Sequence, residues 1–140
     1  MNPLGLKLDH CVVAVSDPER SDAFYRTVLG AEVVRLGPEY RVYRIGDQQL
    51  SVHTPGLASD PASAKFLIRA LDPVRPGNSD ICFEWPGPIA GAVAHLNACN
   101  VLIEAGPRES FGGKGKGDSV YFRDPDGTLL EFIVYASPAA

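Results

Sequence analysis

The stretch LKLDHCVVAVSDPERSDAFYRTVLG, residues 6–30, predicts a buried strand followed at once by a capped helix. Its first ten residues are mostly apolar and rich in β-branched side chains, a composition typical of a covered strand. Ser16 or Asp17 can cap the helix, Pro18 suits its first turn, and Gly30 can end it. The helical spacing then predicts four inward residues, which are Ala23, Phe24, Thr27 and Val28.

Three shorter strands are predicted after this helix, at AEVVRL, YRVYRI and QQLSVH. These segments, residues 31–36, 40–45 and 48–53, contain the β-branched and aromatic residues that favour strands. The turn GDQ, residues 46–48, would join the last two into a hairpin. The first half of the chain is therefore expected to run strand, helix, strand, strand, strand.

The second half repeats this order. SDICFEW, residues 79–85, predicts a strand, and PIAGAVAHLNACN, residues 88–100, predicts a helix with Ile89, Ala92, Val93 and Leu96 inward. VLIEAG, DSVYFR and LLEFIVY are the three strands expected after it, the last two joined across the turn DPDG. The second half is therefore a second βαβββ module.

A shift of 70 residues relates the two halves. It carries His10 to Asp80, and it carries Gly30 to Asn100, a residue that also tolerates the left-handed conformation. We place module one at about residues 5–54, a linker or lid at about 55–77, and module two at about 78–136. The segment AKFLIRAL inside the linker is expected to be a short helix or a lid over a site.

Composition bounds the kinds of partner. With 140 residues the chain is expected to form one domain, and its net charge of -4 and pI near 5.3 argue against a nucleic-acid or anionic-membrane surface. No run of eighteen apolar residues exists, and the N-terminus MNPLGLKLDH lacks the pattern of a signal peptide. We expect a cytoplasmic protein that acts on a small molecule. Its cysteines, Cys11, Cys82 and Cys99, are expected to be buried reduced thiols.

Glu131 stands out in the strand LLEFIVY, because every other residue of that strand is apolar or aromatic. A carboxylate covered without a partner would be strongly destabilising. A metal ion would satisfy it, and so would an ion pair with Arg123 or Arg44.

The doubled βαβββ plan, together with LDHCVVAVSDPERSDAFYRTVLGAEVV and YFRDPDGTLLEF, resembles the vicinal oxygen chelate superfamily of glyoxalases, bleomycin resistance proteins and extradiol dioxygenases. Within it, GDQQLSVH, GNSDICF and SVYFRDPDG most resemble small glyoxalase-domain-containing proteins and a bacterial virulence protein group. The resemblance covers nearly the whole chain. It implies an α+β fold in which two modules pair their sheets into a curved cup, and a homodimer.

The resemblance also implies one divalent metal ion, with ligands from the first and last strands of each module. Carried over by position, His10 and Glu131 are ligands. The last strand of module one has Ser51 at the matching position and His53 two residues further on, on the same face. Asp80 holds the fourth position, as a ligand, a residue that orients a ligand, or a substrate contact.

A site of His10, His53 and Glu131 suits Fe(II), Mn(II), Ni(II), Co(II) or Zn(II). The resemblance implies a metal-dependent lyase or isomerase of the glyoxalase type, whose substrate chelates the metal through two adjacent oxygens, with Glu131 as the base. A non-haem iron dioxygenase and a metal-free protein that binds a drug or metabolite are the alternatives. Arg123 would orient the DPDG turn or contact substrate.

The Gly- and Lys-rich segment FGGKGKGD, residues 111–118, does not match the phosphate-binding pattern GxxxxGK[ST]. Two interpretations stay open. It is either a flexible loop before the strand DSVYFR, or a basic loop that closes over an anionic substrate.

Overall fold

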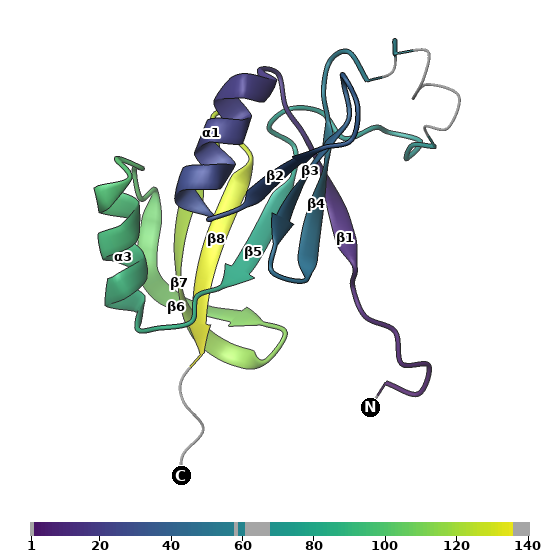
Figure 1. Cartoon of the computed structure of the whole chain (residues 1–140). Helices are drawn as coiled ribbons and strands as arrows, with labels where there is room; N and C mark the ends of the chain where they lie inside the picture. The colour runs from purple at the N-terminus through teal and green to yellow at the C-terminus, as the bar shows by residue number, and fades with distance from the viewer. Residues whose placement is uncertain (1, 58, 61–67, 136–140) are drawn as a thin grey trace. The chain divides into compact units, whose positions relative to one another are not determined.

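The computed structural model describes residues 2–57, 59–60 and 68–135 (Figure 1). It divides the chain into two compact units, residues 1–75 (unit 1) and 76–140 (unit 2). Each unit has a four-stranded mixed sheet and one helix among its described residues. The predicted α+β fold, with strand, helix and three strands in each half, is confirmed.

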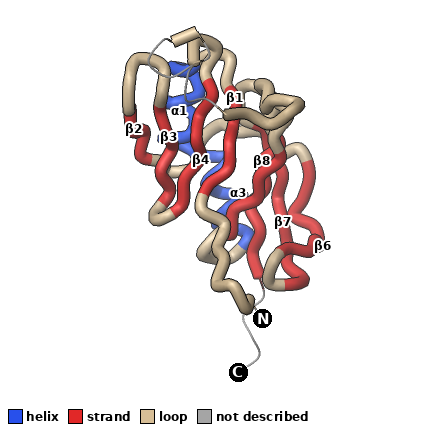
Figure 2. Tube along the Cα trace, turned by 90° about the vertical axis from the view of Figure 1, so that its right-hand side faces the viewer, coloured by secondary structure: helices blue, strands red, loops and turns tan. Residues whose placement is uncertain are grey.

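In unit 1 the strands lie side by side in the order β1, β4, β3, β2 (Figure 2). Strand β1 is parallel to β4, and the other neighbours are antiparallel. The elements are β1 (His10–Ala14), α1 (Pro18–Val28), β2 (Glu32–Arg35), β3 (Arg41–Ile45) and β4 (Gln48–His53). The hairpin predicted at GDQ joins β3 to β4.

Helix α1 begins and ends where its capping residues predict. The Asp17 side chain accepts a hydrogen bond from the backbone N–H of Arg20 at 3.2 Å, which satisfies one of the free donors of the first turn. Gly30 follows the helix with φ at 64°, a conformation that glycine adopts without steric strain.

The inward face of α1 differs from the prediction. Its buried residues are Ser21, Asp22, Tyr25 and Val28. Ala23 and Thr27 are exposed, so they were wrongly placed inward, and Phe24 is only partly buried. The reason lies outside the helix. Asp22 binds the buried Arg41 of β3, and the Tyr25 ring stacks on the Tyr43 ring at 4.6 Å between centroids. A charged residue is therefore inside because the sheet supplies its partner.

Unit 2 has the strand order β5, β8, β7, β6, again with one parallel pair, β5 and β8. Helix α3 lies against β7 and β8 (Figure 1), and Leu96 of this helix is fully buried with Phe122 and Leu130 of the sheet. The elements are β5 (Asp80–Glu84), α3 (Ile89–Ala98), β6 (Ala105–Gly112), β7 (Gly115–Arg123) and β8 (Leu129–Tyr135).

One predicted strand of unit 2 was misplaced. Residues 101–104 of VLIEAG are outside any strand, and β6 runs instead from Ala105 to Gly112, so that most of the Gly- and Lys-rich segment lies in the paired β6–β7 hairpin. The backbone of Gly112 comes very close to Tyr135, because a Cβ at this position would lie 2.1 Å from the tyrosine Oη. Any side chain at position 112 would have to displace the Tyr135 ring, so glycine suits this position of the strand.

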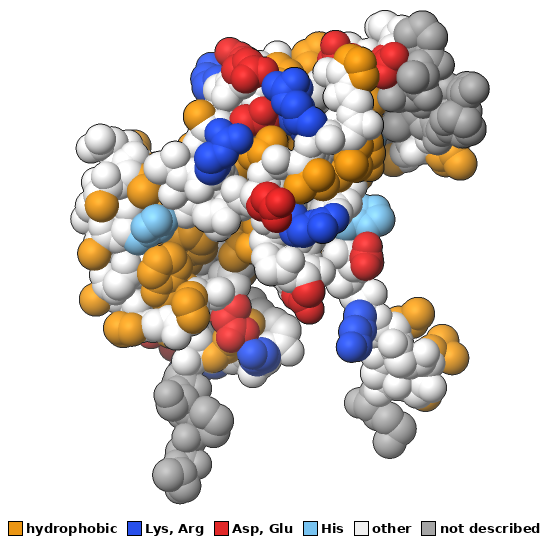
Figure 3. All heavy atoms as spheres, viewed as in Figure 1, with side chains coloured by type: hydrophobic (Ala, Val, Ile, Leu, Met, Phe, Trp, Pro, Cys, Tyr) orange, Lys and Arg blue, Asp and Glu red, His pale blue; other side chains and the backbone are white. Residues whose placement is uncertain are grey.

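The first half of the linker segment AKFLIRAL, residues 64–67, lies outside the described residues, and residues 68–71 are outside any helix. No helix in the described part of the chain is long and apolar enough to cross a membrane. On the face seen in Figure 3, acidic and basic side chains are interspersed, without one continuous basic patch.

Candidate functional site

Each sheet has one face covered by its helix and one that its helix does not cover. In unit 1, Tyr43 packs on α1 and is the cross-strand neighbour of Leu50, so the side chains that alternate with Leu50 point the other way. We call the face of each sheet that its helix does not cover the helix-free face. That of unit 1 carries these residues on β1 and β4: His10, Val12, Ala14, Gln49, Ser51 and His53. Every residue that module one was predicted to supply therefore lies on one face.

His10 opens β1, and its side chain is half exposed at 48%. Its Nδ1 lies 2.7 Å from Oδ2 of Asp9, which orients the ring and leaves Nε2 on the opposite side. Histidines that bind metals in proteins are usually held in this way by a carboxylate. Asp9 is a residue that the sequence reasoning missed, although it is the immediate neighbour of His10.

The strand register sets the distances among the predicted residues of unit 1. His10 lies directly opposite Gln49, with Ser51 two residues further along β4 and His53 four residues further. At roughly 3.3 Å per residue, His10 and His53 are about 13 Å apart along the strands. The structure therefore brings Gln49 and Ser51 close to His10 and keeps His53 apart.

Ser51 and His53 also differ in surroundings. Ser51 is buried, and its Oγ accepts a hydrogen bond from Gln49 Nε2 at 3.3 Å. Burial, together with the nearby positive charge of Arg69, lowers the pKa of His53. His53 is therefore kept neutral, which is the form of histidine that binds a metal.

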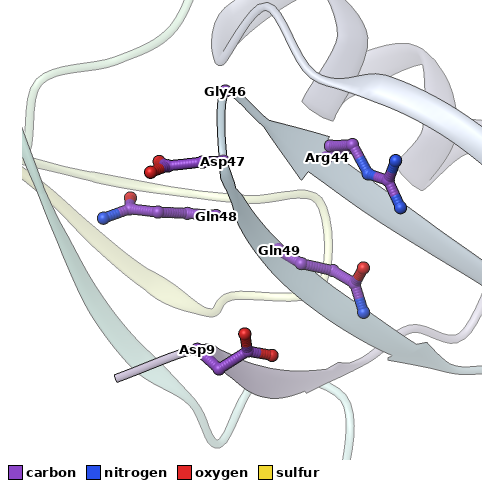
Figure 4. Close-up of a pocket in the computed structure, with 6 residues that line it drawn as sticks. All are labelled: Asp9, Arg44, Gly46, Asp47, Gln48 and Gln49. Carbon is purple, nitrogen blue, oxygen red and sulfur yellow. The ribbon is translucent and has the colours of Figure 1, made fainter. Parts of the chain in front are cut away.

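A polar pocket of about 290 Å³ adjoins His10 at the β3–β4 hairpin (Figure 4). Asp9, which holds His10, is part of its wall. In Figure 4, Arg44 and Gln49 project to one side of the hairpin, and Asp47 and Gln48 project to the other. The surroundings of His10 are therefore polar and accessible to a small molecule.

Glu131 lies in the middle of β8 on the helix-free face of unit 2. Its cross-strand neighbours are Cys82 on β5 and Tyr121 on β7. Ser119 Oγ donates a hydrogen bond to Glu131 Oε2 at 2.5 Å, and Ser110 Oγ lies 2.5 Å from Ser119 Oγ. Glu131 thus has a protein partner on one carboxylate oxygen, which fixes the carboxylate.

The thiol of Cys82 completes this arrangement. The prediction of buried cysteines was wrong, because Cys82 is exposed and Cys11 and Cys99 are only partly buried. Partial desolvation raises the pKa of Cys82 to about 12, and the negative charge of Glu131 and a hydrogen bond to it act in the same direction. The thiol is therefore protonated at neutral pH and leaves the charge of the site on Glu131. Asp80, at the start of β5, lies opposite Leu129 and two residues before Cys82, on the same face.

Arg123 and the two lysines of residues 111–118 have other partners. Arg123 Nε binds Glu104 Oε2 at 2.7 Å, and its guanidinium also donates to the carbonyl of Gly127 at 3.1 Å. This supports the predicted role in holding the DPDG turn, and Arg123 is not the partner of Glu131. Lys114 binds Glu84 at 2.7 Å, and Lys116 binds Glu109 at 2.9 Å. These contacts favour a structural hairpin over a loop that closes on an anion.

His10 and His53 lie in unit 1, whereas Glu131 and Asp80 lie in unit 2. Among the described residues, no group of three or more His, Cys, Asp and Glu side chains is gathered to hold a metal. The ligand set His10, His53 and Glu131 stays a prediction.

Residues 7–132 match the model of the Glyoxalase/Bleomycin resistance protein/Dioxygenase superfamily. The chain belongs to this superfamily. A curated member, virulence protein STM3117 from Salmonella typhimurium, is 31% identical over 92% of this chain and 84% of its own length. The crystal structure of that protein superposes with a TM-score of 0.82 and 32% identity, over 94% of this chain and 98% of the other.

A second member of the superfamily, glyoxalase domain-containing protein RDO1 from Mycosarcoma maydis, is 34% identical over 91% of this chain and 68% of its own length. At lower identity, 18%, the same fold occurs in the fosfomycin resistance protein FosX from Listeria monocytogenes, crystallised with Mn(II) and a sulfate ion. That structure has a TM-score of 0.62, over 93% of this chain and 90% of the other, and it shows the fold alone.

Proposed function

We propose that this superfamily member is a metal-dependent lyase or isomerase. Its substrate would be a small molecule with two adjacent oxygens that chelate one divalent metal ion. The observation that carries the proposal is the matched placement of His10 and Glu131. One lies on the first strand of unit 1 and the other on the last strand of unit 2, both on helix-free faces and both oriented by a neighbouring polar side chain.

The residues present fit a divalent metal. An imidazole nitrogen and a carboxylate oxygen suit Mn(II), Fe(II), Co(II), Ni(II) and Zn(II). Asp9 occupies His10 Nδ1 and Ser119 occupies Glu131 Oε2, so that Nε2 and Oε1 would be the binding atoms. Mn(II) in the FosX structure is consistent with a metal in this fold. Asp80, Gln49 and Ser51 are the candidates for further ligands, whereas His53 lies about 13 Å from His10 along the strands.

The bound metal would polarise the substrate oxygens as a Lewis acid and so acidify the adjacent C–H. Glu131 is the proposed base, because a carboxylate can take that proton and return it to the neighbouring carbon. The hydroxyl of Ser119 holds Oε2 while the proton moves, and the protonated thiol of Cys82 adds no competing negative charge. The reaction is therefore proposed as a proton transfer between adjacent carbons.

A dioxygenase would need two histidines and a carboxylate on one iron. The separation of about 13 Å along the strands between His10 and His53 counts against this ligand set. We therefore place the lyase or isomerase first.

The test is metal content, measured by elemental analysis of untagged protein purified without chelator. About one metal per chain is expected, with loss of that metal in His10→Ala and in Glu131→Gln. His95→Ala is the matched control, because His95 lies on α3 against Trp85 and is expected to leave the metal content unchanged. Unchanged metal content in both site variants would refute the proposal.

Reaction class and assembly follow from two further measurements. Metal-loaded protein that consumes no oxygen with catechols but converts α-keto compounds supports the lyase or isomerase, and oxygen consumption supports the dioxygenase. We also propose a homodimer, which light scattering during gel filtration would detect as twice the mass of the 140-residue chain.

A further inference from the structure

Arg108 lies on the helix-free face of unit 2, close to Glu131. It is the cross-strand partner of Ser119, whose hydroxyl binds Glu131. The Cζ atom of its guanidinium lies 4.9 Å from the centroid of the Tyr121 ring. Tyr121 in turn is directly opposite Glu131 on the neighbouring strand. The Arg108 side chain therefore leans over the ring that adjoins the proposed base.

Arg108 differs from the other basic residues of unit 2 in its electrostatics. Three of the four have an acidic partner: Lys114 with Glu84, Lys116 with Glu109, and Arg123 with Glu104. Across residues 76–135, the part of unit 2 that the structure describes, Arg108 makes no ion pair. It is an exposed cation whose guanidinium lies over an aromatic ring.

The contact with the Tyr121 ring leaves the N–H groups of the Arg108 guanidinium available for hydrogen bonds. A guanidinium that lies over a tyrosine ring can contact it through its flat surface and keep its in-plane N–H groups for hydrogen bonds. Those N–H groups fit the two oxygens of a carboxylate, through paired charge-assisted hydrogen bonds. The stack also reduces the side-chain entropy lost when an anion binds.

The distance between Arg108 and Glu131 sets the length of a substrate that could contact both. Arg108 is two strands away from Glu131 and two residues out of register, which places their Cα atoms about 12 Å apart for strands spaced about 4.8 Å apart. Both side chains project from the same face and the guanidinium leans toward Tyr121. The remaining gap fits a chain of a few carbon atoms.

We infer that Arg108 binds a carboxylate at one end of the substrate, while the two chelating oxygens lie at the other end, near Glu131. The substrate class is then a small carboxylic acid with an adjacent pair of oxygens two or three carbons away. This inference deepens the proposed function and rests on it for the position of the chelating end.

Two hydroxamates test the inference, because they chelate a metal identically and differ in their tails. Acetohydroxamate has no charged tail, and the monohydroxamate of succinic acid has a carboxylate. On Mn(II)-loaded protein, calorimetry should show about 10- to 100-fold tighter binding of the succinic acid probe. In Arg108→Gln this preference should fall to parity, with metal content and acetohydroxamate affinity unchanged.

Arg123→Gln is the matched control, because it removes a cation of the same unit that already has an acidic partner, and it should keep the preference. Equal binding of the two probes by the unsubstituted protein, or a preference that survives Arg108→Gln, would overturn the inference. A phosphonate-tailed hydroxamate bound more tightly than the carboxylate, with the same dependence on Arg108, would replace carboxylate by phosphonate as the recognised group and overturn the stated class.

If the proposed metal-dependent function is wrong, the binding experiments give a result that can be told apart from a failure of the Arg108 site. If no metal binds under any loading, succinate itself becomes the probe on chelator-treated protein. Succinate binding that Arg108→Gln abolishes would support the anion site and refute only the metal. Succinate binding that is absent, or that ignores Arg108, would refute the anion site as well.

Discussion

Replacing Asp22 by Ala is predicted to destabilise unit 1 severely, because it leaves a buried charge without its partner. The side chains of Asp22 and Arg41 are 6% and 4% exposed, and they form an ion pair between α1 and β3. Asp22 Oδ1 also accepts a hydrogen bond from Tyr43 Oη at 2.8 Å. Its loss therefore affects a guanidinium and a hydroxyl that water does not reach.

Breaking a buried ion pair on one side typically costs about 3–5 kcal/mol. Two features of the structure place the expected cost of Asp22→Ala near the lower end of this range. Tyr43 keeps its bond to Ser21 Oγ at 2.8 Å, and Glu19 lies 3.9 Å from the Arg41 guanidinium as a weak substitute. A loss of about 3 kcal/mol is a large part of the roughly 5–15 kcal/mol that stabilises a domain, and it lowers the melting temperature by roughly 10 °C.

Urea and thermal unfolding followed by circular dichroism measure this loss. Near-ultraviolet circular dichroism reports on the packed aromatic rings of both units, the Tyr25 and Tyr43 stack of unit 1 included, and fluorescence of Trp85, the single tryptophan, reports on unit 2 alone. Glu19→Ala is the control on the same helix, because its side chain is 79% exposed, and it should cost less than about 1 kcal/mol.

The double variant Asp22→Leu with Arg41→Met removes both charges. It should be more stable than Asp22→Ala, because hydrophobic replacement of a buried pair is often neutral or stabilising. A free energy of unfolding for Asp22→Ala within about 1 kcal/mol of the unsubstituted protein would refute this reasoning. So would a double variant no more stable than the single one.

Three further predictions concern the candidate site. Asp9→Asn should weaken metal binding by about 10- to 100-fold in a titration, because His10 loses its orienting carboxylate; an unchanged affinity would exclude that role. In chelator-treated protein, Cys82 should react slowly with iodoacetamide at pH 8, and it should react faster in Glu131→Gln because removal of the negative charge lowers the pKa of the thiol. Equal rates in the two proteins would show that Glu131 does not raise the pKa of Cys82. Burial lowers the pKa of His53, so the neutral ring is favoured in the folded state, and its contribution to stability is complete above about pH 6.5 and is lost as pH falls through the folded pKa. In urea unfolding from pH 8 to 5, the free energy of unfolding of His53→Gln should therefore fall less than that of the unsubstituted protein, and identical slopes would count against this interpretation.

Local signals in the sequence were sufficient for most of the fold. The cap at Asp17 and the left-handed residues Gly30 and Asn100 depend only on their own backbone, and all three are as predicted. The DPDG turn also forms, with a hydrogen bond of 3.0 Å from the Gly127 N–H to the Asp124 carbonyl. Periodicity and capping therefore fix the element order.

What the sequence could not reveal depends on partners far along the chain. Asp22 is inside because Arg41, nineteen residues away, is inside as well. The extent of β6 depends on its pairing with β7, which reaches Gly112 opposite Gly115, and no local propensity encodes that pairing. Strand register decides which side chains adjoin a candidate ligand, and register is a tertiary property. That is why Gln49 went unnoticed.

The parallel pairs of strands in the two units match in register, with Val12 opposite Ser51 in one and Cys82 opposite Glu131 in the other. A shift of 70 residues on the first strand, from Val12 to Cys82, and of 80 residues on the last strand, from Ser51 to Glu131, thus equates positions that now hold different side chains. Internal duplication of a gene leaves two copies of each position, and either copy is then able to diverge. In the proposed site one copy supplies the imidazole of His10 and the other supplies the carboxylate of Glu131. Neither half, assembled with a second copy of itself, would reproduce that combination. Once the halves have diverged in this way, the proposed site needs both of them in one gene.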